Sequence, residues 1–266
     1  MANITIGQYY PENSIIHKLD PRVKLAGTML CIIVLFQINT IAGYGLFTIF
    51  MAAVIKASKI PFMKLLKGVR GILFILLFSV VLNIFMTKGE ILLEIGFLTV
   101  TKEGLIKALY ISVRLIYLII CTSIMTLTTT PNDLSDGLEK AFGLLKVVKF
   151  PVHEIAMIMS LALRFIPTLM EETDKITKAQ KARGASFDTG NILQKAKSLI
   201  PILIPLFISS LRRAIDLATA MEARCYHGGD NRTQMKPLRY ESRDYISYVV
   251  MWAYLGIAIV FRIVGI

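Results

Sequence analysis

The sequence is poor in charged residues, in cysteine and in histidine. Only 18% of its 266 residues are charged, whereas soluble domains carry about 25%. Hydrophobic residues make up 55%, which argues against a disordered chain and against a soluble globular domain. Cys31, Cys121 and Cys225 are odd in number and far apart, so no disulfide framework is expected. We therefore expect a membrane protein with reduced cysteines.

The usual motifs of catalysis and of nucleotide binding are missing as well. The sequence contains no G-x-x-x-x-G-K-[ST] loop, no H-E-x-x-H and no G-x-S-x-G. His17, His153 and His227 are too scattered to form a metal site. We therefore predict a protein that is not an enzyme and has no metal site, no cofactor and no ATP binding of its own. The formal charge of +12 is interpreted as a topology signal rather than as a nucleic-acid-binding surface.

Long uncharged runs are the main feature of the chain. No residue from Leu25 to Ile55 is charged, and one helix of that length would reach roughly 46 Å, too long for one bilayer core. Gln37, Asn39, Thr40 and Gly43 predict a turn in its middle, which gives two spans. We predict an all-α, polytopic membrane protein with about five transmembrane helices. Four of them, at about 25–38, 41–56, 70–87 and 108–130, form an N-terminal membrane region, 1–130, and a fifth lies in 245–266.

Lysine and arginine indicate which segments face the cytoplasm, because cytoplasmic loops carry an excess of them. The segment after the second span is basic and contains no acid: Lys56, Lys59, Lys64, Lys67 and Arg70. We therefore predict that it is cytoplasmic, that 131–244 is a cytoplasmic-side region, and that the C-terminus is external. The predicted location is the plasma membrane of a prokaryote, with the lipid bilayer as a partner and no nucleic acid.

Two long helices are predicted in 131–244, after an amphipathic one over 132–148. One follows Pro151 and ends at Arg183-Gly184, and the other runs from about Ile192 to near Arg224. Each has an apolar half, then a charged half, then an arginine. The two ends almost repeat, as Lys181-Ala-Arg-Gly184 and Glu222-Ala-Arg-Cys225. The apolar halves are long enough to enter a membrane or to pack beneath one, and the sequence leaves both possibilities open.

The arginines allow two interpretations each. Arg183 and Arg224 either cap helix C-termini or insert into acidic or carbonyl-lined grooves of a partner, and the repetition favours the second role. Arg114, inside the fourth span, is interpreted as snorkelling or as pairing helices in preference to binding a substrate.

An ordered series of segments resembles the transmembrane T component of energy-coupling factor transporters, a branch of the ATP-binding-cassette importers. The resemblance covers nearly the whole chain. Its segments are Ser14-Ile-Ile-His-Lys-Leu-Asp-Pro-Arg-Val-Lys-Leu25, Leu127-Thr-Thr-Thr-Pro131, Asp136-Gly-Leu-Glu139, Pro151-Val-His-Glu154, Ala162-Leu-Arg-Phe-Ile-Pro-Thr-Leu169, Glu171-Glu-Thr-Asp-Lys-Ile176, Lys178-Ala-Gln-Lys-Ala-Arg-Gly184, Leu211-Arg-Arg213 and Ala220-Met-Glu-Ala-Arg224.

The resemblance implies a coupling subunit that joins two cytoplasmic cassette ATPases to a substrate-binding membrane protein, the S component, for ATP-driven uptake of vitamins or other micronutrients. It places the ATPase contacts on two coupling helices, at Ala182, Arg183 and Gly184 and at Ala223, Arg224 and Cys225. Glycine usually closes the second motif, so we expect Gly228 to terminate that helix in place of Cys225.

Two alternatives remain at this stage. The first is a T component dedicated to a metal-ion importer for cobalt or nickel. The second is a membrane-bound enzyme acting on lipid, which would require clustered acids or histidines at an interface. The sequence shows no such cluster.

Overall fold

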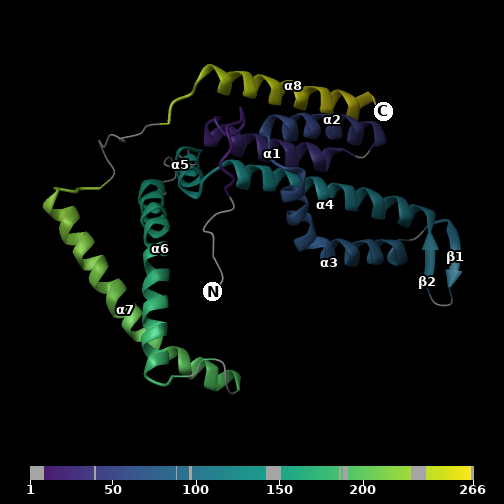
Figure 1. The fold of residues 1–266 in the computed structure, drawn as a ribbon. Coiled ribbons are helices and arrows are strands. Elements are labelled where there is room, and N and C mark those ends of the chain that lie inside the picture. Colours follow the sequence, from purple (N-terminus) through teal and green to yellow (C-terminus); the bar gives the residue numbers. More distant parts are fainter. Residues whose placement is uncertain are drawn as a thin grey trace. The chain divides into compact units, whose positions relative to one another are not determined.

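The structure, a computed structural model, describes residues 9–38, 40–87, 89–95, 98–141, 151–185, 187, 191–228 and 238–264. It contains eight helices and a short antiparallel hairpin within those ranges (Figure 1). The chain divides into two compact units, residues 1–140 with 238–266 and residues 141–237. Each unit is described by itself.

The first unit is built from apolar helices. Its elements are α1 (Pro21–Gln37), α2 (Ile41–Ser58), α3 (Phe62–Met86), β1 (Ile91–Ile95), β2 (Leu98–Thr101), α4 (Lys102–Thr128), α5 (Pro131–Ala141) and α8 (Ser242–Val264). Helices α1, α2, α3, α4 and α8 overlap the five predicted spans, but α3 and α4 begin earlier than predicted, at Phe62 and Lys102. The prediction of an all-α membrane protein is confirmed, with the hairpin β1–β2 as a small addition.

Local sequence signals set the helix boundaries in this unit. Asp20 caps α1 by accepting a hydrogen bond from the backbone N–H of Arg22, and Pro21 occupies the first turn. Thr40 caps α2 and accepts from the N–H of Gly43. Thr101 caps α4 in the same way, and a Cβ on Gly104 would lie 3.0 Å from the carbonyl oxygens of Asn83 and Ile84. Glycine therefore lets the start of α4 approach the end of α3 closely.

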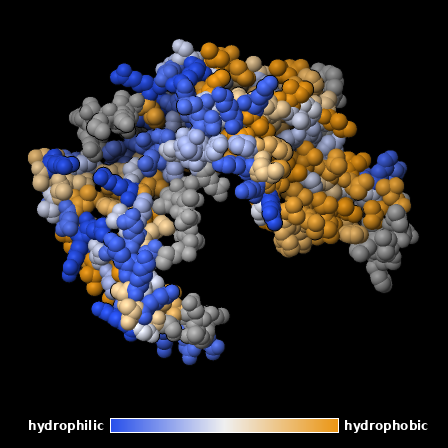
Figure 2. Space-filling model, in the orientation of Figure 1, coloured by the Kyte–Doolittle hydropathy of each residue, from blue (hydrophilic) through white to orange (hydrophobic). Residues whose placement is uncertain are grey.

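The core of the first unit lies where α1, α2, α4 and α8 meet. Its fully buried side chains include Val34, Leu35 and Phe47, and Tyr254 of α8 stacks on Phe50 with ring centroids 4.2 Å apart. Helix α3 contributes only Leu65 to this core, and its remaining apolar side chains are largely exposed. Figure 2 shows the continuous hydrophobic surface over this helix. Such a surface fits a bilayer better than water.

The second unit is a pair of long helices, α6 (Val152–Ala182) and α7 (Ile192–Ala223). Both continue through internal prolines, Pro167 in α6 and Pro201 and Pro205 in α7. Six described helices are long and apolar enough to cross a membrane: α2, α3, α4, α6, α7 and α8. Six is close to the predicted five, but the set differs, because α6 and α7 qualify while α1, at 17 residues, does not.

Candidate functional site

The two predicted arginine motifs form two helix ends of the same geometry. In α6, the N–H of Gly184 donates to the carbonyl of Lys181 (3.0 Å) and the N–H of Ala185 to that of Gln180 (3.0 Å). In α7, the N–H of Cys225 donates to Glu222 (2.9 Å) and the N–H of Tyr226 to Met221 (3.1 Å). This pair of bonds is the Schellman motif, which satisfies carbonyls at a helix C-terminus.

Gly184 and Cys225 occupy the same left-handed position, with φ of 86° and 54°. The expectation that Gly228 terminates α7 is therefore wrong. Gly228 also has a positive φ, 100°, but it lies three residues beyond the position that closes the motif. A non-glycine residue in this conformation costs about 1–2 kcal/mol, and Cys225 bears that cost.

All six motif residues are exposed: Ala182, Arg183, Gly184, Ala223, Arg224 and Cys225. Within the described part of the chain, the side chains of Arg183 and Arg224 form no ion pair and no hydrogen bond. Backbone bonds close both helix ends without help from the guanidinium groups. The structure therefore leaves both guanidinium groups accessible to a partner.

Helices α6 and α7 run in opposite directions along each other. Near one end, the hydroxyl of Tyr226 donates to the sulfur of Met157 (3.2 Å). In the middle, Arg213 forms an ion pair with Glu172 (2.8 Å). Near the other end, the amide of Gln180 donates to the carbonyl of Pro201 (3.4 Å). Arg183 follows the end of α6 and Arg224 the end of α7, so the two arginines lie at opposite ends of the pair. Figure 1 shows the two helices.

The central ion pair joins equivalent positions of the near-repeat. Arg183 follows Glu172 by 11 residues, and Arg224 follows Arg213 by 11 residues. Each arginine thus lies about 16 Å along its own helix from the crossing. The two helix ends are therefore equally spaced, in residues, from the Glu172–Arg213 ion pair. Sequence reasoning missed this pair, although the offset of 41 residues between the two motifs was a signal for it.

A buried carboxylate joins two helix starts in the first unit. Asp244, 2% exposed, accepts hydrogen bonds from the N–H groups of Asp20 (2.9 Å) and Glu241 (2.8 Å). It thus ties the start of α8 to the start of α1. Burial would raise the pKa of the Asp20 carboxyl, but the hydrogen bonds and charge of Arg22 outweigh burial and lower it.

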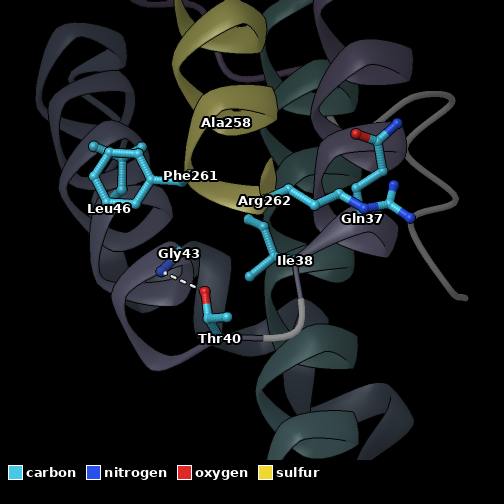
Figure 3. A pocket seen from close by; sticks show the side chains of 8 residues that line it. All are labelled: Gln37, Ile38, Thr40, Gly43, Leu46, Ala258, Phe261 and Arg262. Carbon is cyan, nitrogen blue, oxygen red and sulfur yellow. Dashed lines mark hydrogen bonds between the residues drawn. The ribbon is translucent and has the colours of Figure 1, made fainter. Parts of the chain in front are cut away.

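Arg114 joins helices, as one of its two interpretations predicts. Its guanidinium donates to the carbonyl of Ile38 (3.1 Å) and to the hydroxyl of Tyr44 (3.3 Å), which fixes the corner between α1 and α2 onto α4. A small pocket of about 190 Å³ lies at the same corner, where the side chains of Gln37 and Arg262 lie near each other (Figure 3). No group of three metal-ligating His, Cys, Asp or Glu side chains occurs among the residues that the structure describes.

Comparison with known proteins assigns the family. The family model described as "Cobalt transport protein" (CbiQ) matches residues 12–235. The chain is 54% identical to the energy-coupling factor transporter transmembrane protein EcfT of Ruminiclostridium cellulolyticum over 92% of this chain and 91% of that one. It is 52% identical to EcfT of Clostridium kluyveri (99% and 98% covered) and 45% identical to EcfT of Bacillus subtilis (96% and 98%).

These similarities and the apolar helices make the chain a multi-pass protein of the cell membrane. The matching segments include both exposed helix ends described above. The chain therefore belongs to the family of transmembrane T components of energy-coupling factor transporters.

Proposed function

We propose that this chain couples two cytoplasmic cassette ATPases to a substrate-binding S component, for ATP-driven uptake of vitamins or other micronutrients. One observation carries the proposal: α6 and α7 end in the same exposed motif with an arginine whose guanidinium is accessible. Helix capping alone does not explain this geometry, because backbone bonds already close both ends. In this proposal, ATP hydrolysis belongs to the partner ATPases.

The equal spacing of the two helix ends from the central ion pair supports two equivalent partners. Arg183 and Arg224 lie at equal distances along their helices from the Glu172–Arg213 crossing. Equivalent contacts related by a two-fold axis are typical of paired subunits. A guanidinium offers five N–H donors in a fixed fork, which suits carboxylates and carbonyls in a groove. Each ATPase would then receive one helix end, and closure of the two ATPases would move both ends together.

The same pairing supports a location of α6 and α7 along the membrane surface. Phe165 and Leu169, in the apolar half of α6, line a cleft with Ala214 and Leu217, in the charged half of α7. A crossing of the bilayer by both helices would carry a charged half through hydrocarbon, at about 2.5–3.5 kcal/mol per charge near its centre. Although both helices meet the length and composition of a span, we propose that they remain at the cytoplasmic interface.

The apolar half of α7 supports a docking surface for the S component. Leu203, Phe207 and Leu211 are more than half exposed and follow one another at helical spacing. An exposed apolar face of this kind on a surface helix is typical of contact with lipid or with an apolar protein partner. A rigid connection from this face to Arg224 would pass the movement of the ATPases to the bound S component.

A T component dedicated to cobalt or nickel is the second candidate. The description of the matching family model as a cobalt transport protein favours it, whereas the name of the relatives, EcfT, states no substrate. Uptake of labelled vitamins and of radioactive cobalt or nickel by cells expressing the complete transporter distinguishes the two candidates.

The coupling proposal is tested by substitution of both arginines. Loss of one partner of a buried, hydrogen-bonded charge contact costs roughly 2–5 kcal/mol, or about thirtyfold to several thousandfold in affinity. Arg183→Ala and Arg224→Ala singly should impair uptake more than assembly, because the remaining contact holds the ATPases at high effective concentration. The double variant should lose the ATPases during co-purification.

A matched control removes a neighbouring charge. Lys181 is exposed on the last turn of α6, so Lys181→Ala changes the local charge and leaves the arginine in place. It should keep the ATPases and the uptake. Arg→Lys at either motif should rescue only in part, because an ammonium group lacks the planar fork. A double Arg→Ala variant that retains its ATPases and full uptake contradicts the proposal.

A further inference from the structure

An apolar cavity of about 370 Å³ opens in the first unit, between α1, α2, α4 and α8. It is distinct from the coupling motifs, which belong to the second unit. Its deep end is formed by Cys31, Met51 and Cys121, with the sulfurs of Met51 and Cys121 3.6 Å apart. Its rim includes the exposed side chains of Ile246 and Val250. Apart from Lys24, nearly all of its lining is apolar or weakly polar.

The depth of this cavity matches one leaflet of a bilayer. All of its helical lining lies near a single end of the bundle: residues 23–31 of α1, 50–57 of α2, 121–128 of α4 and 246–251 of α8. Helix α1 begins at Pro21, so Cys31 lies about 15 Å below that end by helix rise. Half of a hydrocarbon core of about 30 Å is the same length. The cavity thus runs from the interface to about the middle of the membrane.

A single cation stands at the mouth of the cavity. The ammonium of Lys24 donates to the carbonyls of His17 (3.0 Å) and Thr128 (2.8 Å), which leaves one of its three N–H donors for a ligand. Lys24 forms no ion pair with any carboxylate in the described ranges. Three carboxylates lie near Lys24, and each has another partner: Asp133 accepts from the hydroxyl of Thr130, Asp20 pairs with Arg22, and Asp244 accepts from two backbone N–H groups. An anionic group is therefore the natural ligand of Lys24.

We propose that the cavity holds an acyl chain of a phospholipid from the cytoplasmic leaflet, whose phosphate binds Lys24. Such a lipid has an anionic headgroup at the interface and an apolar chain as long as one leaflet is deep. The site matches it, because Lys24 lies at the mouth and the apolar cavity extends below it. A soluble ligand would be expected to meet several convergent polar groups, and the lining offers few. If the cavity were empty, its lining would lack dispersion contacts, and an acyl chain from the surrounding bilayer would supply them.

Retention of two lipids that differ only in the headgroup tests the proposal. The full-length chain in maltoside detergent is mixed with dioleoyl-phosphatidylglycerol or with dioleoylglycerol, which has the same chains and no phosphate, and is examined by native mass spectrometry. A charge near a membrane surface contributes about 1 kcal/mol per lysine, which corresponds to about fivefold. We expect one retained phosphatidylglycerol, favoured over dioleoylglycerol by at least about fivefold.

Two variants separate the phosphate contact from the chain contact. Lys24→Gln should remove the preference for phosphatidylglycerol, whereas Lys18→Gln, at an exposed lysine outside the cavity, should keep it. Ala53→Phe should fill the slot and reduce retention of both lipids. Equal retention of the two lipids by the wild-type chain, or full retention by Ala53→Phe, overturns the proposal. Because these two results do not involve Lys24, they decide the matter even if Lys24→Gln fails to fold.

Discussion

Exchange of the residues that close the two Schellman motifs should change the stability of the two helix ends in opposite directions. Cys225 and Gly184 occupy the same left-handed position in otherwise matching backbone geometry. We expect Cys225→Gly to stabilise the end of α7 and Gly184→Cys to destabilise the end of α6. The pair of variants acts as its own control, because each motif receives the residue of the other.

The expected magnitude follows from the backbone alone. A left-handed conformation costs a non-glycine residue about 1–2 kcal/mol. Glycine avoids this cost, but it destabilises the folded state by roughly 0.4–1 kcal/mol because the unfolded chain gains conformational freedom. The difference is about 1 kcal/mol. Side-chain packing adds little, because Cys225 is exposed and a Cβ on Gly184 would meet no atom of the described structure within 4 Å. At about 1.4 kcal/mol per decade, this corresponds to about fivefold in local opening.

Hydrogen exchange at single amides measures this opening directly. The N–H of Tyr226, bonded to Met221, should exchange about fivefold more slowly in Cys225→Gly. The N–H of Ala185, bonded to Gln180, should exchange about fivefold faster in Gly184→Cys. Amides in the middle of α7 should not change. Unchanged or faster exchange at Tyr226 in Cys225→Gly would refute the backbone argument.

Asp244→Ala leaves the buried N–H of Asp20 and the partly buried N–H of Glu241 without an acceptor. The free energy of unfolding in detergent should therefore fall by about 1–3 kcal/mol relative to an exposed control such as Lys18→Gln. A change below about 0.5 kcal/mol would contradict a stabilising role of Asp244. Cysteines introduced at Lys64 and Lys178 should resist an impermeant thiol reagent added outside cells, and labelling at either position would overturn the predicted topology. The purified chain without its partners should not bind ATP, and stoichiometric binding would refute that prediction.

Much of the fold could be predicted because hydrophobic length is a strong signal. Uncharged runs located the helices of the first unit, and the turn between α1 and α2 follows from Thr40 and Gly43, which are joined by a capping hydrogen bond. Proline was a weaker guide in the second unit. Pro201 and Pro205 suggested that the helix is interrupted, yet α7 continues through both. A proline inside a helix can kink it without ending it.

Features that depend on contacts far apart in the sequence could not be predicted. Asp244 binds the backbone N–H of Asp20 across 224 positions, and a backbone donor leaves no mark on the sequence. The hairpin β1–β2 was missed because its strands are only five and four residues long, and so short a run gives no clear strand pattern. Cys225 in a left-handed conformation contradicts the usual preference for glycine, so propensity favoured Gly228.

In the proposed function, ATPases cover both arginine-bearing helix ends of the assembled transporter. Cys225 is an exposed native thiol beside Arg224, and Gly184→Cys places a matching thiol beside Arg183. Alkylation of both thiols by N-ethylmaleimide should be measured by peptide mass spectrometry in the isolated chain and in the complex, with denatured protein as the reference. We predict that both thiols react readily in the isolated chain and at least tenfold more slowly in the complex. Equal reaction rates in the two samples would contradict coverage of these helix ends by the ATPases.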